Sequence, residues 1–302
     1  MHKNICAPNK YDKKNQTCFQ IEQLIEMAGA YNRYLAKNKL NPAINRTHGG
    51  AELIVIKSDK PYLLQEIKKR FETVCDNNDE VCITQQSFMN EIEKEMRYDI
   101  VSNTFRPLGP TKSNEWLSTV DIDNIMYQYE NIYPDFKFYG AVPLDCNELN
   151  FCSLYKINFD NLQKKHINKL GIIFNMDRHG QPGSHWVALY IDISNGKIYY
   201  CNSTGHAPID NIRSIIEQFT QYYKNKTGKN AVYDYNKKSY QRDSSECGVY
   251  SCNFLIRMLA GEDFDHIINT ALSFKEINSC RNSYFRNTPS KYNPDSKCDP
   301  GL

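Results

Sequence analysis

Cys247 occupies a position where a cysteine thiol could act as a nucleophile. Polar, turn-forming residues fill 241–246, and an apolar run then continues to Gly261, a residue type that commonly ends helices. We therefore predict a buried helix that begins at or just before Cys247. The unpaired N–H groups and partial positive charge of a helix N-terminus favour a thiolate, so we expect the pKa of Cys247 to be lowered. Taken alone, Cys247 is better explained as a small buried apolar residue, so its interpretation depends on its partners.

Two partners lie in neighbouring predicted strands. His185 opens an apolar run, and Asn202 lies near the end of a second run, with the turn-forming pair Asn195-Gly196 between them. In an antiparallel hairpin His185 and Asn202 share one face. A two-residue turn would separate them by roughly 13 Å, at about 3.3 Å per residue. A loop two residues longer makes them diagonal neighbours, and we expect this looser loop.

These residues suggest one reaction. Neutral His185 would accept the proton of Cys247 as general base and return it to a leaving amine. Asn202 would orient the imidazole through its side-chain carbonyl. Gln241 and the backbone N–H of Cys247 would form an oxyanion hole. Each residue alone is more often structural, but their order and contexts together favour a catalytic site.

The motifs around these residues resemble the ubiquitin-like-protein-specific cysteine proteases, a superfamily that includes SUMO proteases and the adenovirus protease. The resemblance covers roughly residues 104 to 285 and rests on four segments: Trp116 to Ile122, Gly183 to Trp186, Tyr200 to Gly205, and Gln241 followed by Cys247-Gly248. Cellular members mostly have Asp where this chain has Asn202. With the segment 105–110, Asn202 makes the chain most similar to polyprotein-processing proteases of large cytoplasmic DNA viruses, such as the African swine fever virus protease.

The predicted elements are several helices around a central run of short strands, so the fold class is α+β. The resemblance implies a papain-like-superfamily domain with a mostly antiparallel sheet flanked by helices. It also implies a cleft specific for small residues, often Gly-Gly, before the cleaved bond. We place Trp186, Trp116, Gly183 and Ser184 at this substrate cleft, although the position of Trp116 just before a helix favours core packing over substrate binding.

Three regions are expected along the chain. Residues 1–103 are predicted to form a mainly helical accessory domain, which could be a structural cap or a binding platform. A Pro/Gly-rich linker then leads into a cysteine protease catalytic domain at 104–285. Residues 286–302 are rich in Pro, Ser, Asn and Lys and are predicted to form a flexible C-terminal tail.

Charge and cysteine content restrict the partners and the compartment. The formal net charge of +2 gives no electrostatic reason to expect nucleic acid as a partner. No secretory signal or transmembrane segment is recognisable, so we expect eleven reduced cysteines and no direct membrane insertion. The resemblance to viral proteases implies a location in the host cytoplasm and virion. Cysteine spacings do not fit a zinc site, and we predict neither metal nor cofactor.

The predicted activity is that of a thiol protease, a hydrolase acting on protein through an acyl-enzyme. One substrate hypothesis is a viral structural polyprotein cleaved during virion maturation. The alternative is deconjugation of SUMO or another ubiquitin-like modifier. A third hypothesis is a catalytically inactive binding module on a protease fold, although all four site residues, His185, Asn202, Gln241 and Cys247, are present.

Overall fold

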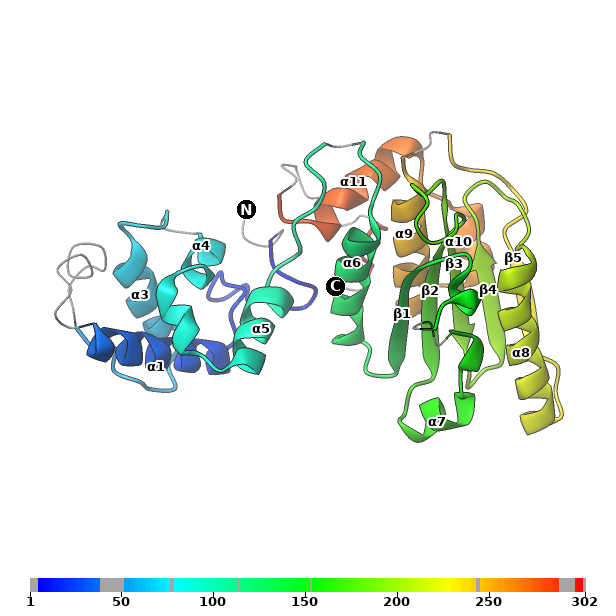
Figure 1. Ribbon diagram of the computed structural model, residues 1–302. Coiled ribbons are helices and arrows are strands. Elements are labelled where there is room, and N and C mark those ends of the chain that lie inside the picture. Colours follow the sequence, from blue (N-terminus) through cyan, green and yellow to red (C-terminus); the bar gives the residue numbers. More distant parts are fainter. Residues whose placement is uncertain are drawn as a thin grey trace. The chain divides into compact units, whose positions relative to one another are not determined.

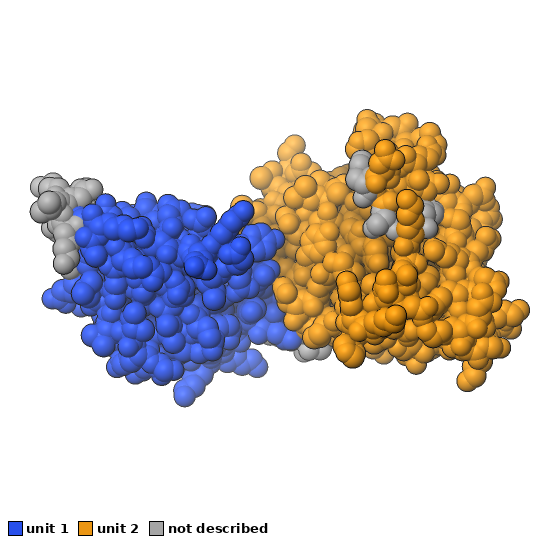
Figure 2. Space-filling model, turned by 60° about the horizontal axis from the view of Figure 1, so that its bottom comes forward, with its two compact units in different colours: residues 1–106 blue, residues 107–302 orange. Residues whose placement is uncertain are grey.

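The computed structural model describes residues 5–38, 52–76, 79–112, 114–150, 152, 154–242, 245–287 and 297–300. The chain divides into two compact units, residues 1–106 and 107–302 (Figure 2). The division lies at Pro107, three residues beyond the boundary that we placed in the Pro/Gly-rich linker.

Helices form the described part of the first unit. They are α1 (Ile21–Lys37), α3 (Lys60–Phe71), α4 (Glu80–Thr84), a 3₁₀ turn (Ser87–Glu91) and α5 (Lys94–Asn103). Tyr31, Phe71 and Phe88 meet in their shared core, where the Phe71 and Phe88 rings stack with centroids 4.9 Å apart. Gly49-Gly50, a pair that predicts a loop between α1 and α3, lies outside the described residues.

A five-stranded mixed sheet organises the described part of the second unit. Its strands lie in chain order: β1 (Phe136–Pro143), β2 (Lys169–Asn175), β3 (Trp186–Asp192), β4 (Lys197–Cys201) and β5 (Val232–Tyr235). The central pairings β2–β3 and β3–β4 are antiparallel, whereas β1–β2 and β4–β5 are parallel. The α+β class is confirmed, but the sheet is mixed rather than mostly antiparallel because both outer strands return by crossover connections.

Helices cover both faces of this sheet (Figure 1). One face carries α6 (Thr119–Glu130), α9 (Cys247–Leu259), α10 (Phe264–Asn269) and α11 (Phe274–Tyr284); α7 (Phe159–Lys164) and α8 (Asp210–Thr227) belong to the other. Side chains of β3 alternate between the two cores, with Ala188 and Tyr190 facing α9 and Val187 and Leu189 facing α8. All seven residues of β3 are therefore buried.

The hairpin between β3 and β4 has the looser loop that we expected. Ala188 pairs with Cys201 and Asp192 with Lys197, which leaves four residues, 193–196, in the connection. In this register Asn202 lies beyond Cys201 and is a diagonal neighbour of His185. The prediction of a loop longer than Asn195-Gly196 alone is confirmed.

The prediction of reduced cysteines was wrong for eight of the eleven. The described residues contain four disulfides, Cys6–Cys18, Cys75–Cys82, Cys146–Cys152 and Cys280–Cys298. Cys201, Cys247 and Cys252 are buried and are not disulfide-bonded. Pairing could not be inferred because it depends on which segments fold together, which cysteine spacing alone does not reveal.

A flexible tail was expected from residue 286 to residue 302. This expectation was also wrong for residues 297–300, which the structure describes. The segment Lys297–Pro300 packs against the helices of the sheet's α9 face. Its Cys298 is 1% exposed and disulfide-bonded to α11, and its Asp299 accepts a hydrogen bond from the Tyr129 hydroxyl at 2.8 Å. Residues 288–296, 301 and 302 of the predicted tail lie outside the described part. Among the described residues, no helix has the length and apolar character needed to cross a membrane.

Candidate active site

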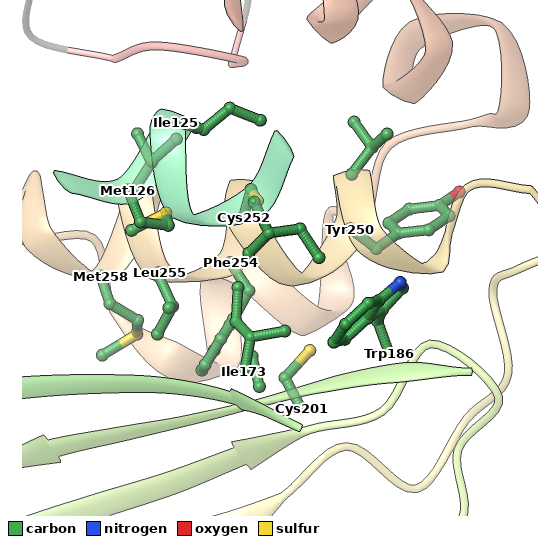
Figure 3. Packing of buried hydrophobic residues seen from close by; sticks show 14 of the residues in the cluster. Ile125, Met126, Ile173, Trp186, Cys201, Tyr250, Cys252, Phe254, Leu255 and Met258 are labelled. Atoms are coloured by element: carbon green, nitrogen blue, oxygen red, sulfur yellow. The ribbon is translucent and has the colours of Figure 1, made fainter. Parts of the chain in front are cut away.

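The helix α9 positions Cys247 as its first residue, as the sequence predicted, with Glu246 as the N-cap. The helix is buried along its whole length, because apolar side chains surround it on nearly every side. Phe254 and Leu255 point toward Ile173 of the sheet, and α6 packs on the opposite side of α9 (Figure 3). A helix held on both sides gives the thiol a rigid support.

Gly248 allows α9 to approach its neighbours closely beside the nucleophile. A Cβ atom at this position would lie 3.1 Å from Leu117 Cβ and 3.3 Å from Trp186 Cδ1. The Trp186 indole N–H also donates to the Leu117 carbonyl at 2.9 Å. The start of α9, the start of β3 and the segment before α6 therefore converge at one tightly packed point.

The thiol of Cys247 is 1% exposed, and burial raises its pKa above the usual cysteine value. Hydrogen bonds from the backbone groups of Trp186, Gly248 and Cys247 itself act in the opposite direction, while the Glu246 carboxylate raises the pKa further. The expected lowering of this pKa is therefore wrong, because desolvation outweighs the helix N-terminus. The bond with Trp186 nevertheless places the sulfur beside the residue that follows His185.

His185 and Asn202 meet as the register requires. His185 Nε2 lies 2.8 Å from Asn202 Oδ1. Burial is the main cause that lowers the pKa of the imidazole; the bond to Asn202 raises it, and nearby His206 lowers it. The lowered pKa of His185 and the raised pKa of Cys247 favour a neutral imidazole and a neutral thiol.

Gln241 is held in place by Ser203. The Gln241 backbone N–H donates to the Ser203 carbonyl at 3.1 Å, and the Ser203 hydroxyl donates to Gln241 Oε1. This orientation directs the amide NH₂ group of Gln241 away from Ser203. The residue thereby presents a donor group, which is the chemistry that an oxyanion hole needs.

The residues proposed for the substrate cleft occupy different environments. Trp186 is buried against Leu117, whereas Trp116 is 37% exposed. Gly183 has φ +89°, and its Cβ would clash with the Asn175 side chain at 2.6 Å, so only glycine fits there. Ser184 is exposed and its hydroxyl donates to Asp177 at 2.7 Å. Trp186 is therefore part of the packed support, and Trp116 and Ser184 are the accessible members of the set.

A cavity of about 410 Å³ lies beside the loop that leads into His185. Its lining combines apolar residues of β1 and the Cys146–Cys152 disulfide with Asn175 at the end of β2 and with polar loop residues that include Arg178 and His179. Thr119, the first residue of α6, also lines it. In the described ranges, this cavity included, no group of three or more His, Cys, Asp or Glu residues is arranged to hold a metal ion.

Sequence reasoning missed Asn236, Ser203 and Leu117. Asn236 and Ser203 are 1% and 4% exposed and hold Asn202 and Gln241 respectively. A buried Asn after a strand resembles any turn residue in sequence, so no local signal identified Asn236. Ser203 directly follows Asn202 in sequence, and this adjacency was the one signal that could have identified it as a site residue.

Comparison with known proteins identifies the family. Residues 155–289 match the model of the Ulp1 protease family, C-terminal catalytic domain. Over 297 residues, 98% of both chains, the protein is 60% identical to R355, a candidate thiol protease of Acanthamoeba polyphaga mimivirus.

The chain belongs to the Ulp1 protease family.

More distant viral relatives agree with this family assignment. The cysteine protease S273R of African swine fever virus is 22% identical over 239 residues, which cover 73% of this chain and 86% of the relative. A crystal structure of the African swine fever virus pS273R protease has the same fold, with a TM-score of 0.63 and 17% identity over 94% of this chain and 96% of that one. As a member of the Ulp1 family, the chain is a thiol protease.

Proposed function

We propose that the protein is a cysteine endopeptidase in which Cys247, His185, Asn202 and Gln241 form the catalytic site. The observation that carries this proposal is the 2.8 Å contact between His185 Nε2 and Asn202 Oδ1, made next to the strand residue whose backbone bonds the Cys247 sulfur. The geometry matches a Cys-His-Asn site, in which a neutral amide orients the imidazole.

The proposed mechanism begins with a neutral pair. With Nε2 committed to Asn202, the Nδ1 atom of His185 is the nitrogen that accepts the thiol proton as Cys247 Sγ attacks the scissile carbonyl. The tetrahedral oxyanion receives hydrogen bonds from the Gln241 amide and the Cys247 backbone N–H. His185 then protonates the leaving amine, and water hydrolyses the resulting thioester.

We also propose cleavage after small residues, with Gly-Gly-like sites preferred. The support is the tight convergence of Gly248, Leu117 and Trp186 beside the thiol, where a single added Cβ already makes contacts of 3.1 to 3.3 Å. A substrate backbone that reaches a 1% exposed sulfur must be slender. Glycine before the cleaved bond meets that requirement because it has no side chain.

The proposed substrates are viral structural polyproteins, cleaved in the host cytoplasm and virion during maturation. Similarity to viral proteases along nearly the whole chain, with its helical N-terminal unit, supports this proposal. We propose that residues 1–103 act as an accessory domain of the catalytic region 104–285. The alternative is deconjugation of a ubiquitin-like modifier, because one African swine fever virus relative, 22% identical, is named a SUMO-1 cysteine protease.

The deciding experiment compares wild-type protein with Cys247→Ala on two fluorogenic substrates, a Gly-Gly-X peptide and a SUMO or ubiquitin C-terminal reporter. Cys252→Ala is the matched control, since Cys252 is a second free, buried thiol on the same helix. Cleavage of the peptide alone, lost in Cys247→Ala and kept in Cys252→Ala, supports the endopeptidase. Cleavage of the modifier reporter alone moves the assignment to deconjugation, and silence on both favours a binding module.

A further inference from the structure

Asn202 can face His185 with either end of its side-chain amide, an ambiguity that an aspartate in its place would not have. The two oxygens of a carboxylate are equivalent, so either one can accept the His185 proton. An asparagine amide has one acceptor end and one donor end, and a flip of the side chain would direct NH₂ at the imidazole. The site therefore needs something that fixes which end of Asn202 faces His185.

The turn after Asn202 supplies partners of fixed polarity for both ends of the amide. The Thr204 backbone N–H, which can only donate, lies 3.0 Å from Asn202 Oδ1. The His206 backbone carbonyl, which can only accept, lies 3.4 Å from Asn202 Nδ2. Both groups require the same orientation, with the oxygen toward Thr204 and His185. A flipped amide would place donor against donor and acceptor against acceptor.

The Thr204 side chain strengthens this arrangement. Its hydroxyl donates to Asn202 Oδ1 at 2.7 Å, and its Oγ1 also lies 2.9 Å from His206 Nδ1. Because the hydroxyl proton is directed at Asn202, His206 Nδ1–H is the donor in the second contact. Asn202 Oδ1 thus accepts from three donors, one on His185 and two on Thr204.

The turn has this shape because of Gly205. Its φ of +78° is a left-handed conformation that favours glycine. A Cβ atom here would lie 2.8 Å from the backbone of Lys238 and Ser239. The Gly205 N–H donates to the Asn202 carbonyl at 2.7 Å, which closes the turn and brings the backbones of Thr204 and His206 around the Asn202 side chain.

We propose that Thr204 is a positioning residue that holds the Asn202 amide with its oxygen toward His185. A neutral asparagine can then accept the His185 hydrogen bond and orient the imidazole, as an aspartate would. This inference rests on the proposed function of His185 and Asn202. The locked oxygen requires a proton on His185 Nε2, which leaves the lone pair of Nδ1 for the Cys247 thiol. Thr204 acts through Asn202 and touches no reacting atom.

A double-mutant cycle tests the proposal, because a symmetric carboxylate needs no orienting partner. Thr204→Val removes the hydroxyl and keeps the shape. We expect it to lower kcat about fivefold to tenfold, the loss of one hydrogen bond, with little change in KM. Thr204→Ser should restore activity to within about twofold of wild type, since it keeps the hydroxyl. In an Asn202→Asp background, Thr204→Val should change kcat by less than about twofold.

An equal loss from Thr204→Val in both backgrounds would overturn the proposal, since a purely structural role does not depend on the residue at 202. No loss in the native background would overturn it as well. Melting temperatures of all variants identify any loss that comes from unfolding.

A second readout needs no substrate. In protein labelled with ¹⁵N-histidine, the two ring nitrogens of neutral His185 report which one carries the proton. We expect protonated Nε2 in wild type and Thr204→Ser, and a shift toward mixed tautomers in Thr204→Val. An unchanged tautomer in Thr204→Val would overturn the proposal. If wild-type protein shows no Cys247-dependent cleavage, the proposed function fails, while the tautomer still decides the role of Thr204.

Discussion

The Asn236 side chain hydrogen-bonds both the N–H and the carbonyl of Asn202, as the backbone of a neighbouring strand would. Its Oδ1 accepts from the Asn202 N–H at 2.7 Å, and its Nδ2 donates to the Asn202 carbonyl at 2.6 Å. Asn202 lies one residue beyond the end of β4, where sheet hydrogen bonds are no longer supplied by β5. A single buried side chain therefore extends the sheet by one residue and holds the partner of His185 in place.

We expect Asn236→Ala to reduce both stability and activity. It leaves the buried Asn202 N–H without this acceptor, a loss of about 1–3 kcal/mol, whereas the Asn202 carbonyl keeps its bond from the Gly205 N–H. Chemical denaturation and kcat/KM on the peptide substrate measure the two effects. Asn230→Ala, at an exposed position just before β5, is the control and should change neither. Wild-type stability in Asn236→Ala would show that the contact is not structural.

Activity should persist in mildly acidic solution. The mechanism requires neutral His185, and burial lowers the pKa of this imidazole. As pH rises, kcat/KM should therefore increase through a midpoint below the ordinary histidine pKa of about 6.5. A pH profile of kcat/KM gives the midpoint directly. A fall of kcat/KM through a midpoint above the ordinary histidine value would instead indicate an imidazolium stabilised by a thiolate.

Alkylation of Cys247 should be slow near neutral pH. Burial raises the pKa of this thiol, so the reactive thiolate forms only above the ordinary cysteine pKa of about 8.5. Iodoacetamide labelling followed by peptide mass spectrometry measures the rate against pH. Fast labelling of Cys247 below pH 8, absent in His185→Ala, would contradict this expectation and show that His185 withdraws the proton before substrate binds.

Ser203→Ala should lower kcat while leaving KM nearly unchanged. It removes the hydroxyl that orients the Gln241 amide, so we expect a loss of about tenfold, the scale of one hydrogen bond. Gln241→Ala should cost more, roughly 10²–10³ in kcat, as removal of an oxyanion donor does. Ser214→Ala, on the exposed surface of α8, is the control. If the Ser203 and Gln241 losses simply multiply in the double variant, the two residues act independently.

The elements that local patterns predict well are those that carry the chemistry. The apolar run after Cys247 predicted the start of α9, and the requirement that His185 and Asn202 come within reach on one face of a hairpin predicted the longer loop. Both signals lie within about twenty residues of sequence. The helix α11, by contrast, was missed because its mixed polar sequence has only a weak apolar stripe.

Contacts between distant segments could not be predicted. The raised pKa of Cys247 comes mainly from burial of its thiol in the folded unit, which depends on segments far from Cys247 in sequence. The hydrogen bonds of Asn236 to Asn202 span 34 positions, and the Cys280–Cys298 disulfide depends on the path of the chain between them. Such features follow from tertiary packing, which propensity and periodicity do not encode.

The packing of Lys297–Pro300 sets an order of events during synthesis. The Lys297 carbonyl accepts from Asn253 of α9 at 2.9 Å, and the Cys298 carbonyl accepts from Tyr284 of α11 at 2.9 Å. Translation at about 5–20 residues per second places this segment roughly 3–10 s behind Cys247. The core around the nucleophile is therefore completed last. We expect a ribosome-arrested chain that ends before residue 297 to be inactive toward the peptide substrate, and its release after full extension to start activity.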